Sequence, residues 1–228
     1  MDAGHRSVNL EFSQKYDSEH CKSYLQKHRT GFFRKLSHWR EEQMARKALY
    51  LAGQPNSVLD LPCGAGRFWP LLEEKSNRII VAADNSTDML NVAWSANGSV
   101  DHPRIQLLHT SAFDIALPGR SVDCIFCIRL LHHIGTPQDR ALLLREFHRV
   151  SRDTLIISLW VDGNYKAWRR RQLERRRSAH ADGNPQNRFV IPRRQIEEEF
   201  HGAGFEILGK IDFLPFYQMW RTYVLRKY

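Results

Sequence analysis

From residue 57 to residue 160, short apolar runs alternate with longer segments whose apolar residues recur at helical spacing. The short runs are typical of buried strands, which we expect at 57–61, 78–83, 104–109, 121–130 and 154–160. The longer segments predict helices at 41–51, 68–75, 87–96 and 137–150. Strands that alternate with helices at this spacing form right-handed βαβ units, so the pattern predicts a parallel sheet with helices on both faces.

After residue 160 the pattern changes. Residues 161–190 have almost no apolar periodicity and are rich in arginine, which favours an insertion over the sheet instead of another βα unit. A helix and two strand-like runs follow at 191–201, 205–213 and 218–227. The short connection around Pro215 predicts a hairpin, which would put an antiparallel strand at one edge of the sheet.

The residues after the first expected strand form the most distinctive motif. Asp60 is followed by Gly64 and Gly66. Glycines permit a tight turn and let a ligand approach the main chain closely. An acid four residues before the first glycine can orient the loop or reach a cationic ligand, which a phosphate-binding loop does not need.

Composition limits the partners. The 34 Lys and Arg exceed the 25 Asp and Glu, and the formal net charge of +9 favours phosphate-rich partners or an anionic membrane surface. Residues 1–29 lack the apolar core of a secretory signal, and no stretch is apolar for long enough to span a membrane. We expect a cytoplasmic protein, with peripheral contact to the inner membrane surface as an option.

The cysteines do not predict a disulfide framework or a metal site. Cys124 and Cys127 form a CxxC pair, but residues three apart in a strand point to opposite faces. That geometry opposes both a disulfide and shared metal ligation, and the sequence has no further ligands at zinc spacing. We expect buried, unreactive thiols.

Four motifs occur in the order found in class I S-adenosylmethionine-dependent methyltransferases, and the chain most resembles the small-molecule, type 11 branch that includes the quinone-type enzymes. They are the glycine loop and the segments 83–90, 117–123 and 131–134. The resemblance covers roughly residues 40–160 and, more loosely, the terminal hairpin. It implies S-adenosylmethionine as the cofactor and methyl transfer as the activity.

The residue pattern and the resemblance together predict the fold: α/β, with a Rossmann-like seven-stranded, mostly parallel sheet, helices on both faces, an antiparallel C-terminal edge hairpin and the arginine-rich insertion after strand five. We expect one domain, 1–228. Its parts are an N-terminal helical lid, a cofactor-binding core, the insertion and a C-terminal helix with the hairpin, at 1–52, 53–160, 161–190 and 191–228.

In an open parallel sheet the ligand lies beyond the carboxyl ends of the strands, where the strand order reverses. Asp84 follows Gly64 by about 20 residues, the spacing at which an acid accepts the ribose hydroxyls. The family binds adenine after the third strand, where Ser111 stands in place of the usual acid, with Asp114 nearby. Arg129 would meet the methionine carboxylate or the substrate. The expected cofactor-binding residues are Asp60, Gly64, Ala65, Gly66, Asp84, Asn85, Ser111, Ala112, Phe113 and Arg129.

Two related classes fit less well. A dinucleotide dehydrogenase needs a third glycine where Trp69 stands, and no Tyr-x-x-x-Lys pair supports hydride chemistry. The basic charge would suit a nucleic-acid methyltransferase. However, the Asn-Pro-Pro-aromatic motif for exocyclic amines and the Pro-Cys nucleophile for cytosine are both absent.

Methyl transfer depends mainly on positioning the acceptor in line with the methyl group. If the acceptor is a hydroxyl, His132 or His133 is the candidate general base, since both belong to the loop after the fourth strand. A structural role for this pair is the alternative.

A run of arginines is the second unusual feature: Arg169, Arg170, Arg171, Arg175, Arg176 and Arg177. These side chains repel one another unless an anion is bound, and guanidinium groups bind phosphates in a bidentate manner. The expected anions are a phosphorylated glycolipid, a phospholipid headgroup, a cyclic dinucleotide or RNA. A solvated surface helix is the alternative.

Three functions are therefore considered. The favoured one is a methyltransferase acting on a small-molecule or envelope-associated acceptor, such as a lipid, a phosphorylated glycolipid or a lipopolysaccharide-type molecule. The others are an RNA methyltransferase and a regulatory module that senses an anionic ligand such as a cyclic dinucleotide.

Overall fold

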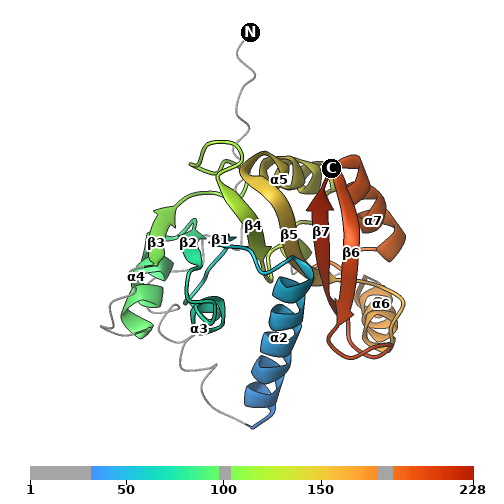
Figure 1. Cartoon of the computed structure of the whole chain (residues 1–228). Coiled ribbons are helices and arrows are strands. Elements are labelled where there is room, and N and C mark those ends of the chain that lie inside the picture. The colour runs from blue at the N-terminus through green and yellow to red at the C-terminus, as the bar shows by residue number, and fades with distance from the viewer. Residues whose placement is uncertain (1–31, 98–103, 179–186) are drawn as a thin grey trace.

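The computed structural model describes residues 32–97, 104–178 and 187–228, without the side chains of 32–34 and 175–178. Seven strands form one sheet in the order β3-β2-β1-β4-β5-β7-β6 (Figure 1). The strands are β1 (Ser57–Asp60), β2 (Ile79–Asp84), β3 (Ile105–His109), β4 (Val122–Cys127), β5 (Ser151–Trp160), β6 (Phe205–Asp212) and β7 (Trp220–Lys227). The strand order reverses between β1 and β4, where ligands bind in such sheets.

Helices cover both faces of the sheet, as predicted. On one face, apolar residues of α2 (Phe32–Leu51), α3 (Trp69–Leu72) and α4 (Thr87–Ala96) share a core with the sheet. On the other face the core is filled by α5 (Pro137–Val150) and α7 (Arg193–Gly202). Cys124 belongs to the first core and Cys127 to the second. Both thiols are buried and free, as expected from their spacing.

The hairpin is present, but its topology refines the prediction. β7 pairs antiparallel with both β5 and β6, so it is the inner strand of the hairpin and β6 forms the edge. The strand that runs against the others therefore lies one position inside the sheet.

Several predicted boundaries are wrong. Helix α2 begins at Phe32 instead of residue 41, and β5 begins at Ser151 instead of residue 154. The helix expected at 68–75 is only the four-residue α3. The strand expected to reach residue 130 ends at Cys127, because the chain then turns at Arg129, where φ is +68°, into the short 3-10 helix η2 (Leu131–His133). The helix expected from residue 191 begins at Arg193, because Pro192 occupies the N-cap and Ile191 forms a bridge with Val161.

The arginine-rich insertion contains one helix, α6 (Tyr165–Ser178). Its first turn packs Ala167 into the protein. No helix among the described residues is long and apolar enough to cross a membrane.

Candidate functional site

The loop after β1 places two glycines in the left-handed region, with φ of +54° at Gly64 and +68° at Gly66. A Cβ on Gly66 would lie 2.5 Å from Asn97 Nδ2 and 2.8 Å from the Trp69 ring, so that position is filled by its own neighbours. A Cβ on Gly64 would meet nothing within 4 Å. The main chain at Gly64 therefore faces open space, as a ligand cradle requires.

Asp84, at the end of β2, connects this loop to the next one. Its Oδ2 accepts a hydrogen bond from the Gly64 amide at 3.0 Å, and its Oδ1 accepts one from the Ser86 amide at 3.1 Å. Burial raises the pKa of Asp84, while these amide donors partly oppose the rise. Each oxygen keeps a lone pair for a further donor, which is what recognition of two vicinal hydroxyls needs.

Asp60, at the end of β1, is almost fully buried, and its Oδ2 accepts no hydrogen bond among the described residues. Burial and the nearby Asp84 carboxylate raise the pKa of Asp60 well above its ordinary range, while Trp69 and Arg67 oppose the rise. A buried carboxylate of this kind is suited to a cationic ligand, since such a ligand would relieve the cost of ionising it.

The residues after β3 lie beside Asp84, because the Thr110 amide donates to the Asp84 carbonyl at 3.0 Å. Ser111 Oγ accepts a hydrogen bond from the Phe113 amide at 3.2 Å, which closes a tight turn. Ala112 is buried, whereas the Asn85 side chain on the neighbouring loop is exposed. The structure thus brings the predicted residues of β1, β2 and β3 to one edge of the sheet.

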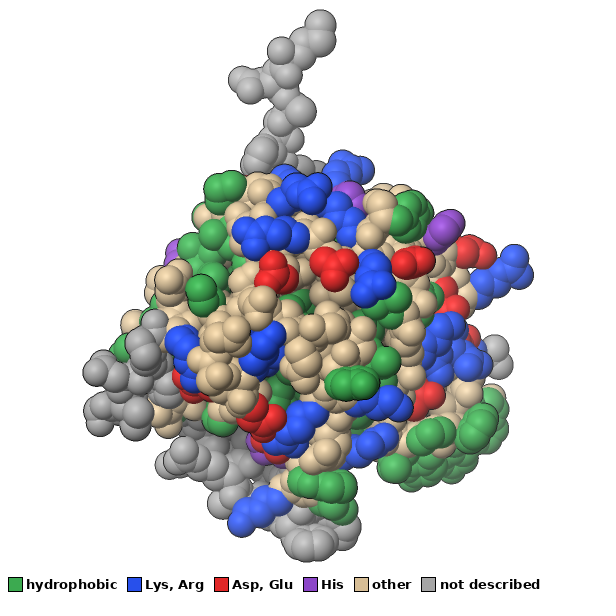
Figure 2. All heavy atoms as spheres, in the orientation of Figure 1, with side chains coloured by type: hydrophobic (Ala, Val, Ile, Leu, Met, Phe, Trp, Pro, Cys, Tyr) green, Lys and Arg blue, Asp and Glu red, His purple; other side chains and the backbone are tan. Residues whose placement is uncertain are grey.

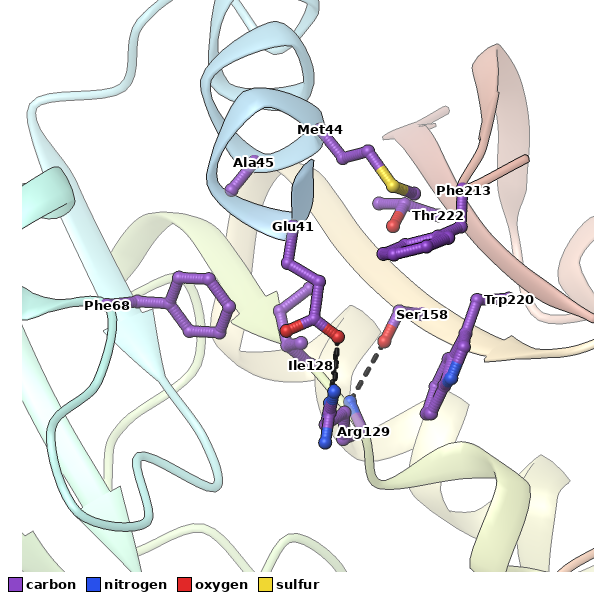
Figure 3. A pocket seen from close by; sticks show the side chains of 10 residues that line it. All are labelled: Glu41, Met44, Ala45, Phe68, Ile128, Arg129, Ser158, Phe213, Trp220 and Thr222. Carbon is purple, nitrogen blue, oxygen red and sulfur yellow. Dashed lines mark hydrogen bonds and ion pairs between the residues drawn. The ribbon is translucent and has the colours of Figure 1, made fainter. Parts of the chain in front are cut away.

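Arg129 follows β4 and contacts a residue that the sequence did not single out. Its Nε lies 3.1 Å from Oε1 of Glu41 on α2, and its guanidinium lies 5.2 Å from the centre of the Trp220 ring (Figure 3). The other Glu41 oxygen, Oε2, lies 2.8 Å from Arg67 Nη2 in the glycine loop. Glu41 therefore joins α2 to the loops after β1 and β4. The sequence does contain a signal for Glu41. This residue lies at helical spacing from the inward-facing Met44, Ala45 and Ala48, and an acid on the apolar face of a helix is unusual.

A small cavity of about 20 Å³ lies beside this ion pair. It is lined by apolar and aromatic side chains, most of them from α2, the glycine loop and the hairpin, with Glu41, Arg129, Ser158 and Thr222 as polar members (Figure 3). The lining includes Glu41, Met44, Phe68, Arg129, Phe213 and Trp220. Space of this size admits about one water molecule.

His132 and His133 differ sharply in environment. The His132 ring is buried, with centroids 4.9 Å from the Trp160 ring and 4.8 Å from the Trp220 ring. Burial, then the neighbouring His133 and nearby arginines, lower the pKa of His132 to about 2. His133 is less buried, and its Nδ1 lies 2.7 Å from the Asn187 carbonyl, which assigns the proton to Nδ1 and leaves Nε2 as an acceptor.

The arginines of α6 are partly neutralised by the protein itself. Arg170 pairs with Glu174 at 2.6 Å and covers the Trp160 ring at 4.9 Å, and Arg171 pairs with Asp162 at 3.0 Å. Arg169 is exposed. The side chains of Arg175, Arg176 and Arg177 lie outside the described residues.

The glycine turn, the acid after β2 and the reversal of strand order are the features expected of a class I S-adenosylmethionine-dependent methyltransferase. Residues 59–156 match the family model of a methyltransferase domain, which supports the expected type 11 branch. No curated protein matches the sequence significantly.

Solved structures share the fold at low sequence identity. Magnesium protoporphyrin IX methyltransferase from Synechocystis PCC 6803 with bound SAH is 14% identical, with a TM-score of 0.68 over 88% of this chain and 89% of that chain. A SAM-dependent methyltransferase from Aquifex aeolicus is 19% identical, with a TM-score of 0.64 over 94% and 100%. A methyltransferase in complex with the Trm112 activator from Haloferax volcanii is 14% identical, with a TM-score of 0.62 over 97% and 99%.

S-adenosylmethionine is the cofactor, and the residues at the sheet edge fit it. The open space at Gly64, the free acceptor capacity of Asp84 and the unpaired Asp60 Oδ2 match an adenosine with vicinal hydroxyls and a cationic amino acid. When bound, the cofactor supplies a methyl group on a sulfonium centre.

Proposed function

We propose that the chain methylates a small organic acceptor that has a flat apolar part and an anionic or hydrogen-bonding group. The observation that carries this proposal is the lining of the cavity beside the glycine loop. Phe68, Phe213 and Trp220 offer ring faces there, and the Arg129 guanidinium lies at the same place. Ring faces suit a flat apolar group, and a guanidinium suits a carboxylate, a phenolate or a phosphate.

Acceptor entry requires movement, because the present cavity is far smaller than a usual ligand pocket of about 300–1,000 Å³. Helix α2 carries Glu41 and Met44 into the lining, and Arg129 is held by Glu41. We propose that α2 acts as a lid, and that an anionic acceptor or the methionine carboxylate takes the place of Glu41 on Arg129. Of the lid expected at 1–52, residues 1–31 lie outside the described residues.

The catalytic contribution of the chain is mainly positioning, with Asp84 and Asp60 fixing the cofactor and Arg129 fixing the reaction partner. If the acceptor is a hydroxyl, we propose His133 as the general base. Its Nε2 is the acceptor nitrogen, whereas the lowered pKa of His132 makes that ring a poor base.

We further propose that the arginine run of α6 binds an anionic group of the acceptor, such as the phosphate of a phosphorylated glycolipid. Arg169 supports this, because its side chain is exposed, whereas the neighbouring Arg170 and Arg171 each pair with an acid. A cyclic dinucleotide or RNA would use the same guanidinium chemistry, and both are outcomes of the experiment below.

The test is transfer of labelled methyl from S-adenosylmethionine into separate cell fractions: small molecules, lipids, glycolipids and RNA. Label in the small-molecule, lipid or glycolipid fraction with the wild type, and none with Asp84→Ala, would support the proposal. Label confined to RNA would overturn it in favour of an RNA methyltransferase. Cofactor binding without label in any fraction would also overturn it and favour the sensing role.

A variant tests the acceptor site once a labelled acceptor is in hand. Phe213→Ala removes one ring face, so KM for the acceptor should rise about tenfold, from the loss of about 1.4 kcal/mol of binding, while cofactor affinity stays the same. Tyr50→Ala on α2 is the matched control, because Tyr50 is exposed and is not part of the lining. Equal KM values in the two variants would contradict this position for the acceptor.

A further inference from the structure

Large apolar side chains gather at one exposed corner of the molecule, where α6 begins and the loop between β6 and β7 turns. The exposed fractions are 59% for Trp168 and 88% for Phe216. Figure 2 shows hydrophobic side chains at the lower right, over these segments, with Lys and Arg side chains beside them. We call this surface the aromatic face; it consists of Tyr165, Trp168, Leu214, Phe216 and Tyr217.

The aromatic face is a fixed structure made from two segments that lie far apart in the sequence. The amides of Tyr165 and Lys166 donate to the carbonyls of Phe216 and Tyr217 at 2.9 and 3.0 Å. The Tyr165 and Tyr217 rings stack, with centroids 5.7 Å apart and an angle of 11° between planes. The Trp168 ring lies beside Tyr165, with centroids 5.9 Å apart, and both Trp168 and Phe216 are exposed to solvent.

Basic side chains border the aromatic face. Lys166 Nζ lies 5.3 Å from the centre of the Tyr217 ring, and Arg169 is exposed one residue after Trp168. The acids nearest in the chain, Asp162 and Glu174, are engaged by Arg171 and Arg170. The border therefore presents positive charge that is not balanced at the surface.

We propose that the aromatic face docks on an anionic phospholipid bilayer. Trp168, Phe216 and Tyr217 enter the interfacial region, and Lys166 and Arg169 contact the headgroups. Aromatic rings favour the boundary between headgroups and acyl chains, and basic residues beside them bind anionic lipids. RNA fits less well, since Phe216 and Leu214 are large exposed apolar side chains, whereas a nucleic-acid strand is bound by a positively charged groove that follows its backbone.

The position of the aromatic face links docking to the reaction. The loop that carries Phe216 is flanked by Phe213 and Trp220, and both line the candidate acceptor cavity. Docking would hold this end of the cavity against the bilayer, so the acceptor would be a molecule held in or on the membrane. This last step rests on the proposed function, whereas docking itself does not.

Vesicle co-sedimentation of the full chain tests the proposal. Vesicles of phosphatidylcholine with about one-third phosphatidylglycerol should bind the protein, and pure phosphatidylcholine should bind it at least about tenfold more weakly, because the basic border needs anionic lipid. Trp168→Ala combined with Phe216→Ala should weaken binding to the anionic vesicles by about tenfold or more. Trp94→Ala combined with Tyr50→Ala is the matched control, because those rings are also exposed but lie on α4 and α2. The control should bind like the wild type.

Several results would overturn docking by this face: no binding of the wild type to either vesicle, equal binding of the two double variants, or self-association of the wild type through Trp168 and Phe216 in solution. Binding to RNA with none to vesicles would overturn it as well. Calorimetric titration with S-adenosylmethionine should give the same affinity for both double variants and the wild type, which shows that they are folded. Failure of docking therefore leaves cofactor binding intact and is distinguishable from failure of the methyltransferase proposal.

Discussion

At the scale of single residues, the two loop glycines have the same backbone geometry but different surroundings. Both have positive φ, yet Gly66 is enclosed by Asn97 and Trp69, whereas Gly64 faces open space. The sequence motif could not separate a glycine needed for packing from one that leaves room for a ligand.

Gly64→Ala should therefore retain the fold and lose cofactor affinity. The left-handed conformation costs an alanine about 1–2 kcal/mol, and the new methyl group would occupy the space in front of the loop. Gly66→Ala has the same backbone cost and adds contacts at 2.5 and 2.8 Å, so its free energy of unfolding should fall further. Urea denaturation and calorimetric titration measure the two effects. A Gly64→Ala protein that binds the cofactor like the wild type would contradict this assignment.

The lowered pKa of His132 predicts that the folded protein loses stability in acid. The folded-state pKa is lowered from 6.5 to about 2, so the unfolded chain takes up a proton at this residue as pH falls below 6.5 while the folded chain does not. The free energy of unfolding should therefore decrease between pH 7 and pH 5. His132→Leu should reduce this decrease, and replacing the exposed His201 by Leu should not. Urea denaturation at the two pH values measures it; identical pH dependence in all three proteins would count against a buried neutral His132.

Part of the candidate site could be predicted from the sequence. Asp60, Asp84 and the glycines are close in the chain to strand ends, so motif spacing and strand order place them together. Glu41 was missed because it reaches the site from α2, and its partners Arg67 and Arg129 are distant in sequence. Local patterns do not encode such pairs.

At the scale of elements, Arg140 ties α5 to α7 and to the turn after η2. Its guanidinium is buried, pairs with Glu199 at 2.6 and 2.7 Å, and donates to the carbonyls of Ile134 and Gly135. One side chain therefore holds the loop of the two histidines against the sheet.

Arg140→Ala should lower the free energy of unfolding by about 3–5 kcal/mol, because it leaves a largely buried carboxylate without its cationic partner and two carbonyls without their donor. Arg145→Ala is the control, since Arg145 is exposed on the same helix. Urea denaturation of both variants measures the difference. If the two variants were equally stable, the pair with Glu199 would not hold the elements together.

The elements themselves were predictable to different degrees. Helices α4 and α5 were predicted to the residue, because Ser86 and Thr136 cap them and their apolar spacing is regular. Helix α6 has no apolar stripe, since it packs through Ala167 and through the guanidinium of Arg170 on Trp160. A pattern of apolar residues does not reveal a charged side chain that packs against the protein.

At the scale of the whole molecule, the site is closed by parts that are remote in the chain. Arg40 of α2 donates to the carbonyls of Asp212 and Phe213 at the end of β6, while Glu41 of the same helix binds Arg67 and Arg129. The order of the core strands follows from βαβ chirality, but the docking of α2 on the hairpin depends on these long-range contacts. This explains why the sheet was predictable and the closure of the site was not.

Because the proposed cofactor-binding residues come from the loops after β1, β2, β3 and β4, unfolding of any of these loops would destroy the proposed site. S-adenosylmethionine at about 100 times its dissociation constant should therefore raise the free energy of unfolding by about 2.7 kcal/mol. For a chain of this size, that corresponds to a rise in Tm of roughly 5–11 °C. Differential scanning calorimetry with and without the cofactor measures the shift.

Asp84→Ala is the control that connects this shift to the site. It removes the acceptor of the Gly64 and Ser86 amides, so the variant should be less stable on its own and its Tm should not respond to the cofactor. An equal rise in Tm for the variant would mean that the cofactor binds away from the carboxyl ends of β1 and β2. Glu41 links the glycine loop to α2. If α2 acts as a lid, hydrogen exchange during the same titration should show that the amides of α2 become more protected when the cofactor binds.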